Sequence, residues 1–179
     1  AATRTQEIAD EVGVNKALVH YYFRTKEKLY FEIVKQDLDS MVPRIAKAMS
    51  TEGIFWERVE RVVDIYTKVL IEEPDIPFFI MSELSQQRER FVAELQKRSV
   101  FFPAIQQFLM KMQEAMAKGE IKEIPPIHLM LNIISMTVFP FMAKPVFCSV
   151  FSFPEADFID LMKERKVFIM RFLQDALRC

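Results

Sequence analysis

The chain has 179 residues, with 24 Lys and Arg against 25 Asp and Glu, and its formal net charge is −1. This balance excludes a polybasic tail and an acidic disordered segment. With 51% hydrophobic residues and only 3 Gly, the composition favours a helical globular chain over an all-β sandwich or barrel, which needs more glycine in its turns. The 17 Phe and 11 Met are the compositional excess that a function must explain.

The N-terminal segment is predicted to hold two short helices around Gly13. Residues 5–24 read TQEIADEVGVNKALVHYYFR. Ala9 is small where two helices would cross closely, Gly13 supplies the turn, and Asn15 is a good N-cap for the second helix. This spacing is that of a helix-turn-helix, although a simple helical hairpin with a glycine turn gives part of the same pattern.

Basic charge gathers at this motif. Residues 16–28 contain four basic residues and one acidic residue, a local charge of +3 on a chain that is net −1. Lys26 has the reach to bind a phosphate, Lys16 could hydrogen-bond a guanine edge, and Leu18 could touch a thymine methyl group. The exposed set that could enter a major groove is Lys16, Ala17, Leu18, His20 and Tyr21.

A third helix is predicted from Thr25, which can act as its cap, to about Met49. The pattern leaves open whether Pro43 kinks or ends this helix. From Phe55 an amphipathic helix with one apolar stripe follows, until Glu73-Pro74 stops it.

Three further helical segments are predicted before the last quarter of the chain. Pro77 starts the first, and the helical pattern resumes at Phe91 after the polar stretch from Ser85 to Glu89. Residues 101–118 then form the next helix, with Gly119 as its C-cap.

The run from Ile124 to Ala143 contains 20 residues without a charge, which is long enough to cross a membrane. It carries three prolines and several polar residues, and no second such run exists, so we expect a buried or interface helix and no membrane partner. After Pro140 and Pro145, residues 147–153 are predicted to form a loop, and Pro154 begins the final helix.

Catalytic and metal-binding patterns are weak throughout the sequence. Cys148 and Cys179 are isolated, with His20 and His128 as the only histidines, so neither a disulfide framework nor a zinc site is supported. No nucleophile-base pair, paired-carboxylate motif or glycine-rich phosphate loop stands out. We therefore expect no enzyme activity, no cofactor and no metal site, and we expect a location in the reducing cytoplasm.

The string GVNKALVHYYFRTKEKLYFEIV resembles the N-terminal signature of TetR-family transcriptional repressors. In that signature a glycine turn, a lysine-bearing recognition helix, paired aromatic residues ending in Phe, and a Ser/Thr-Lys-Glu helix start occur in this order. The resemblance covers residues 2–34, and the rest of the chain matches the family by architecture only. It implies an all-α fold, with a helix-turn-helix DNA-binding domain at residues 1–30 and a helical effector-binding and dimerisation domain at residues 31–179.

Family members have a helix before this motif, whereas this sequence starts at Ala1-Ala2-Thr3 without an initiator Met. We therefore expect the chain to be a fragment of a longer polypeptide whose first helix is missing or disordered.

The resemblance also implies sites. Family dimers place one recognition helix from each subunit in successive major grooves, roughly 34–36 Å apart. Leu18 stands where a small polar residue is usual and His20 where tyrosine is common, so the operator preference is not carried over. The DNA-binding candidates are Thr3, Thr5, Lys16, Ala17, Leu18, His20, Tyr21 and Lys26.

The Phe and Met excess suits the regulatory domain, because both residue types can enclose an apolar compound, although each is more often plain core. The effector-binding candidates are Trp56, Tyr66, Phe78, Met81, Phe102, Gln106, Met110, Met130 and Asn132. The dimer-interface candidates are Ile133, Phe139, Phe158, Leu161, Phe168 and Phe172.

The sequence thus predicts a ligand-responsive regulator, in the first place a repressor. It would bind a palindromic operator in double-stranded DNA as a homodimer and leave it when a small hydrophobic effector binds. The alternative is a dimeric module that binds hydrophobic ligands and has no DNA-binding activity. Mutation of Lys16 and Tyr21 would separate the two.

Overall fold

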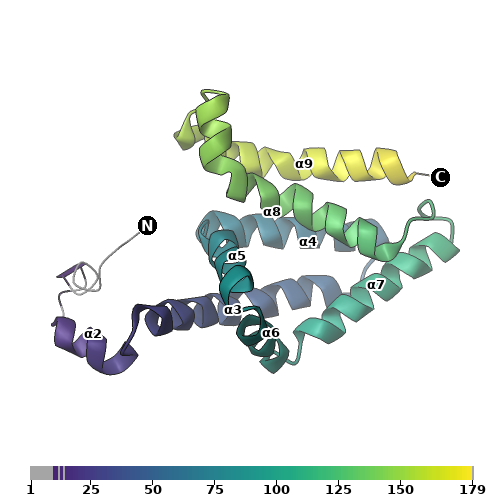
Figure 1. The fold of residues 1–179 in the computed structure, drawn as a ribbon. Helices are drawn as coiled ribbons and strands as arrows, with labels where there is room; N and C mark the ends of the chain where they lie inside the picture. Colours follow the sequence, from purple (N-terminus) through teal and green to yellow (C-terminus); the bar gives the residue numbers. More distant parts are fainter. Residues whose placement is uncertain (1–9, 12, 14, 179) are drawn as a thin grey trace. The chain divides into compact units, whose positions relative to one another are not determined.

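The computed structural model describes residues 10–11, 13 and 15–178, without the side chains of residues 16, 19, 20, 26 and 27. These described residues form helices joined by short turns and loops, and no strand occurs among them, as the composition predicts (Figure 1). The chain divides into two compact units, residues 1–38 and residues 39–179.

The turn chemistry predicted for the first unit is present. Gly13 has a φ of +68°, a backbone conformation that glycine adopts without steric cost. At the start of α2 (Lys16–Phe23), the Asn15 side chain accepts a hydrogen bond from the Ala17 N–H at 2.8 Å. At the start of α3 (Lys26–Ser50), the Thr25 hydroxyl accepts one from the Lys28 N–H at 3.3 Å. Both predicted N-caps are therefore confirmed.

The second unit contains the C-terminal part of α3 and all later helices. These helices are α4 (Phe55–Glu72), α5 (Ile76–Gln86), α6 (Arg88–Lys97), α7 (Phe101–Ala117), α8 (Pro126–Val150) and α9 (Phe158–Leu177), with a 3₁₀ turn η1 (Glu155–Asp157) before α9. The apolar stripe of α4 packs against α7, α8 and α9, and α8 and α9 lie side by side (Figure 1). The buried core includes Val59, Val62, Phe108, Met112, Leu129, Phe141 and Leu173.

The loop predicted at residues 147–153 is wrong in large part, because α8 continues past Pro140 and Pro145 to Val150. Proline has no N–H, so at position 140 it leaves the carbonyl oxygen of Met136 without its helical donor. Arg165 of α9 supplies a replacement, since its Nε donates to that oxygen at 3.0 Å. A side chain from another helix thus satisfies the backbone group that the proline frees.

Two other proline predictions resolve differently. Pro43 does not end its helix, because α3 runs through it to Ser50. Pro154 is followed first by the 3₁₀ turn η1, so α9 begins at Phe158, later than predicted.

At the end of α7, the predicted C-cap is confirmed. Gly119 has a φ of +70°, and the N–H groups of Gly119 and Glu120 donate to the carbonyl oxygens of Met116 and Ala115.

One charged cluster ties α4 to α9. The Lys166 ammonium lies 3.1 Å from an Asp64 carboxylate oxygen and 3.3 Å from one of Glu60. Burial by itself raises the pKa of Asp64, but hydrogen bonds from Lys68 and Lys166 outweigh it and hold this pKa below its ordinary value. Asp64 therefore remains ionised at neutral pH and holds the two helices together.

Candidate functional site

The first candidate site is the exposed face of α2. Ala17, Leu18 and Tyr21 all lie on the surface, and Tyr21 is 77% exposed. The Asn15 cap fixes where this helix begins, so it sets which side chains share the exposed face. The structure thus brings three of the predicted DNA-binding residues together on one short helix.

The other predicted DNA-binding residues cannot be placed in the same way. Thr3 and Thr5 lie outside the described residues, as do the side chains of Lys16, His20 and Lys26. The backbone of residues 16, 20 and 26 belongs to α2 and α3.

Tyr22 is one exposed residue that the sequence interpretation did not include. It is also largely exposed, and its ring meets that of Tyr21 edge to face, with ring centroids 5.3 Å apart. The paired aromatic residues in the sequence were the available signal. Two neighbouring phenols on the surface form a rigid amphipathic contact that can donate hydrogen bonds to phosphate oxygens.

The effector-binding candidates are spread over the second unit. Trp56, Tyr66 and Met130 are half-buried. The remaining candidates are exposed, and these are Phe78, Met81, Phe102, Gln106, Met110 and Asn132. The structure therefore does not gather the set into one enclosed cavity.

Tyr66 is the member of this set with the clearest binding chemistry. Burial raises the pKa of Tyr66 to about 12, so its phenol stays protonated. None of the hydrogen bonds of the described chain involves its hydroxyl. A protonated phenol of this kind can orient a ligand by donating a hydrogen bond.

The dimer-interface candidates divide into two groups by burial. Ile133 and Phe158 are only 1% exposed, so their side chains belong to the core of the subunit itself. Leu161 is half-buried. Phe139 of α8 and Phe168 and Phe172 of α9 are largely exposed. Only this last group is available in full to a partner.

Further exposed apolar residues extend this surface beyond the predicted set. They are Ile127, Leu131, Val146 and Val150 of α8, Phe151 after it, and Val167 of α9. In length and composition α8 could cross a membrane, and only 17% of its most apolar window is buried in the subunit. The uncharged run in the sequence indicated a buried or interface helix. Because a loop was predicted at residues 147–153, the C-terminal part of this surface was not predicted. We call the exposed apolar residues of α8, of α9 and of position 151 the α8–α9 surface.

Metal chemistry has no support in the described part of the chain. No group of three or more His, Cys, Asp or Glu side chains there could hold a metal ion.

Comparisons with known proteins agree with the geometry of the first unit. Residues 1–33 match the sequence model of the family described as bacterial regulatory proteins, tetR family. Two HTH-type transcriptional regulators of Mycobacterium tuberculosis, from strains CDC 1551 / Oshkosh and ATCC 25618 / H37Rv, are each 23% identical to this chain over 141 residues. The match covers 78% of this chain and 59% of each relative, so it spans less than two thirds of the relatives' length.

Solved structures share the fold of the chain. PfmR, a TetR family transcriptional regulator from Thermus thermophilus, aligns with a TM-score of 0.68 at 16% identity, over 95% of this chain and 88% of its own. A candidate fatty acid metabolism regulator of Clostridium perfringens gives a TM-score of 0.63 at 16% identity, over 94% and 88%. A regulator of the TetR/AcrR family from Thermobifida fusca YX-ER1 gives 0.64 at 19% identity, over 94% and 86%.

Proposed function

Since this chain belongs to the TetR family of transcriptional regulators, which are not enzymes, we propose that it is a ligand-responsive repressor. It binds a palindromic operator in double-stranded DNA as a homodimer in the cytoplasm. A small apolar effector in the second unit releases it from the operator.

The observation that carries the proposal is the exposed face of α2. Leu18 and Tyr21 are large side chains on a helix of only 8 residues, and their exposure leaves them available to a partner. An α-helix of this size fits the major groove of B-DNA, where Leu18 can contact a thymine methyl group. The local charge of +3 over residues 16–28 supplies the attraction to phosphate.

The α8–α9 surface supports the homodimer. Exposed apolar residues continue from α8 onto α9, and α9 carries charged residues that make it unfit to cross a membrane. A protein partner covers both helices at once, whereas a lipid bilayer would suit α8 alone. We therefore propose that a second copy of the chain covers the α8–α9 surface, as helices do across the two-fold axis of a bundle.

The proposed effector is apolar because Met and aromatic side chains dominate the set of candidate effector-binding residues. Within this set, the Tyr66 hydroxyl would orient the effector by a hydrogen bond. One structural neighbour is named for fatty acid metabolism, which makes medium-chain fatty acids suitable first probes. An effector releases DNA only if it binds the DNA-free state more tightly. Couplings between two such sites are typically about 1–3 kcal/mol.

The test is a gel-shift titration of the full protein with the DNA upstream of its own gene. We expect Lys16→Ala and Tyr21→Ala to weaken binding, and Lys163→Ala, which removes the same charge from α9, to leave it unchanged. We also expect affinity to fall steeply between about 50 and 200 mM salt, because phosphate contacts release counterions.

If neither α2 variant changes the shift, or if affinity does not respond to salt, the repressor assignment is contradicted. The chain would then fit the alternative, a dimeric module for hydrophobic ligands without DNA-binding activity.

A further inference from the structure

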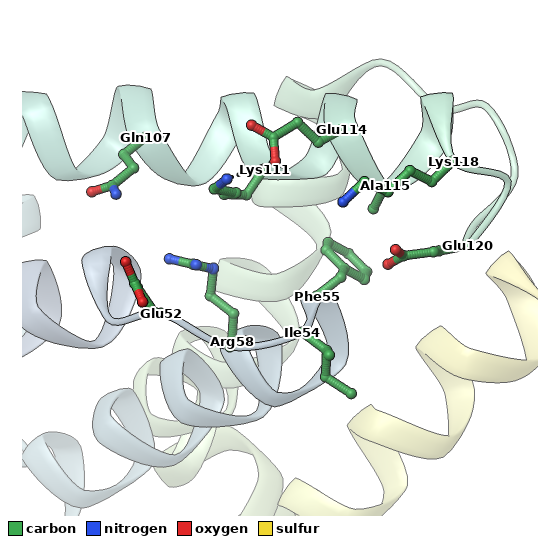
Figure 2. Close-up of a pocket in the computed structure, with 11 residues that line it drawn as sticks. Glu52, Ile54, Phe55, Arg58, Gln107, Lys111, Glu114, Ala115, Lys118 and Glu120 are labelled. Atoms are coloured by element: carbon green, nitrogen blue, oxygen red, sulfur yellow. Dashed lines mark hydrogen bonds and ion pairs between the residues drawn. The ribbon is translucent and has the colours of Figure 1, made fainter.

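A pocket of about 420 Å³ lies in the second unit between the α3–α4 loop, the start of α4 and the face of α7. Its lining differs from the apolar effector candidates, because charged side chains dominate it. They include Arg58, Lys111, Lys118, Glu52, Glu114 and Glu120. Figure 2 shows the Arg58 guanidinium in the space between α4 and α7, facing the side chains that α7 contributes.

Arg58 is the unusual group in this pocket because it is a buried charge without a counter-ion. Its side chain is among the largest fully buried ones, with only 2% exposure. Nη1 donates to the Met49 carbonyl oxygen at 2.8 Å, while Nε is buried and has no hydrogen-bond partner. A buried guanidinium is normally paired with a carboxylate, because its removal from water is costly.

The carboxylates nearest to Arg58 do not pair with it. Glu114 is engaged with Lys111, at 2.6 Å, and Glu52 lies on the exposed loop. Both act on Arg58 only through space, and burial together with the nearby charge of Arg61 lowers the pKa of Arg58 more than the two glutamates raise it. No ion pair of the described chain includes Arg58.

The hydrogen bond from Arg58 to the Met49 carbonyl, near the C-terminus of α3, uses only one of the N–H donors of the guanidinium. One N–H is enough to bind the Met49 carbonyl, and Arg61 holds the carbonyls of Thr51 and Glu52, at 3.2 and 2.9 Å. An apolar side chain with a capping partner elsewhere would avoid burial of a charge. The remaining donors of Arg58 thus call for an acceptor that the described chain does not supply.

The start of α4 adds donors on the same side. Its N-cap is Ile54, which has no polar side-chain atom, and no side chain caps this helix. The first N–H groups of a helix have no partner within the helix, and together with the helix dipole they attract negative charge. Phe55 and Ile54 of this segment also give the pocket an apolar wall.

We propose that this pocket is a binding site for a small organic acid, with the acid group, a carboxylate or a phosphate, as the counter-ion of Arg58. The acidic rim of Glu52 and Glu120 favours a ligand that carries an ammonium or hydroxyl donor beside its acid group. Binding is a property of the second unit alone, so it holds whether or not the chain binds an operator.

Calorimetry of the purified protein tests the proposal with three probes at fixed ionic strength: benzoate, phenylalanine and inorganic phosphate. We expect saturable binding of at least one probe at one site per chain, with a Kd of about 1 mM or tighter. Arg58→Met should weaken it by about tenfold or more, as loss of a charged hydrogen bond does. Arg44→Met, which removes the same charge from an arginine paired with Glu72 outside the pocket, should leave binding unchanged.

Because Arg58→Met also removes the bond to Met49, its fold is checked by circular dichroism, and a second measurement uses the unaltered protein. The side-chain amide signals of Gln107, assigned by their loss in Gln107→Leu, should shift on titration with the probe that binds. Benzoate or phenylalanine without phosphate would identify a carboxylate ligand, and phosphate alone a phosphoryl ligand. Absence of saturable binding by all three, equal binding by folded Arg58→Met, or unmoved Gln107 signals would overturn the proposal.

Discussion

The exposed aromatic side chains of α2 and those of the α8–α9 surface differ in one atom type. On α2 the exposed rings are phenols, Tyr21 and Tyr22, whereas on α8 and α9 they are the phenyl rings of Phe139, Phe168 and Phe172. A phenol can keep its hydroxyl hydrogen-bonded to water or phosphate while its ring makes contact, which suits a wet and charged interface. A phenyl ring gains only from leaving water, which suits a dry protein interface. The exposed fractions alone would place the tyrosines of α2 and the phenylalanines of α8 and α9 in one class. The phenol oxygen, which phenylalanine lacks, distinguishes the two kinds of surface.

The largest effect should come from a charge placed on the α8–α9 surface, which is proposed to form a dry interface. In Phe172→Asp, dimerisation would bury an unpaired carboxylate, which we expect to cost about 2–4 kcal/mol or more and to weaken the dimer by about 30-fold to 1000-fold. Sedimentation velocity over a concentration series measures this. Phe102→Asp, at an exposed phenylalanine of α7, is the control. A dimer that tolerates Phe172→Asp would show that another surface pairs the subunits.

At the exposed face of α2, removal of a single side chain should already reduce operator affinity. Tyr21→Ala removes a ring and a hydroxyl from the proposed DNA contact, and we expect operator affinity to fall by about 1–2 kcal/mol, roughly fivefold to thirtyfold. Tyr21→Phe isolates the hydroxyl and should account for about half of the loss. If Tyr21→Phe binds DNA as tightly as the unaltered protein, the phenol oxygen has no part in recognition and the contrast between the two surfaces fails.

The support beneath the α8–α9 surface can be tested separately. Arg165→Met removes the donor to the Met136 carbonyl oxygen that Pro140 leaves without a helical partner. We expect the free energy of unfolding to fall by about 1–2 kcal/mol, the usual cost of an unsatisfied buried acceptor. Chemical denaturation at one fixed protein concentration measures it. Arg88→Met, at an exposed position of α6, should change stability little. Equal stability of the two variants would mean that α8 holds its shape without Arg165.

The smallest effect concerns the charged tie between α4 and α9. The pKa of Asp64 is lowered in the folded chain, so its contribution to stability is present above its unfolded pKa and is lost as pH falls through the folded value. Asp64→Asn should therefore destabilise the protein at pH 7 by less than about 1 kcal/mol, and this difference should shrink below about pH 4. Asp160→Asn, at an exposed pair with Lys163, is the control. A difference that grows on acidification would contradict the sign of this shift.

Local signals in the sequence predicted most of the helix boundaries. The caps at Asn15 and Thr25 and the turn at Gly119 were predictable, because each depends on the backbone chemistry of a few neighbouring residues. The path of α8 was not, because the carbonyl that Pro140 leaves without a helical donor is satisfied from a different helix, by Arg165 of α9. The same limit applies to the predicted dimer interface, because the burial of Ile133 and Phe158 depends on how α8 and α9 pack within the subunit.

The sites follow the same division. The exposure of Ala17, Leu18 and Tyr21 on α2 was predicted, because a short motif fixes which residues face outward, although the prediction left out Tyr22. The charged pocket beside α7 could not, because Arg58 stands at the edge of the α4 apolar stripe, between Phe55 and Val62, where a long basic side chain can equally well extend into solvent. Its burial arises only when the α3–α4 loop and α7 close over it. A long-range contact of this kind leaves no local pattern.

The hydrogen bond from Arg165 to Met136 also has a consequence for folding during synthesis, because its two partners are made at different times. During synthesis the whole of α8 leaves the ribosome before α9, so the freed carbonyl of Met136 initially has only water as a partner. Arg165 lies 29 residues further along the chain, so it reaches this carbonyl only once α9 has been made. The apolar surface that is proposed to pair two subunits is therefore incomplete until α9, the later of its two helices, has packed against α8.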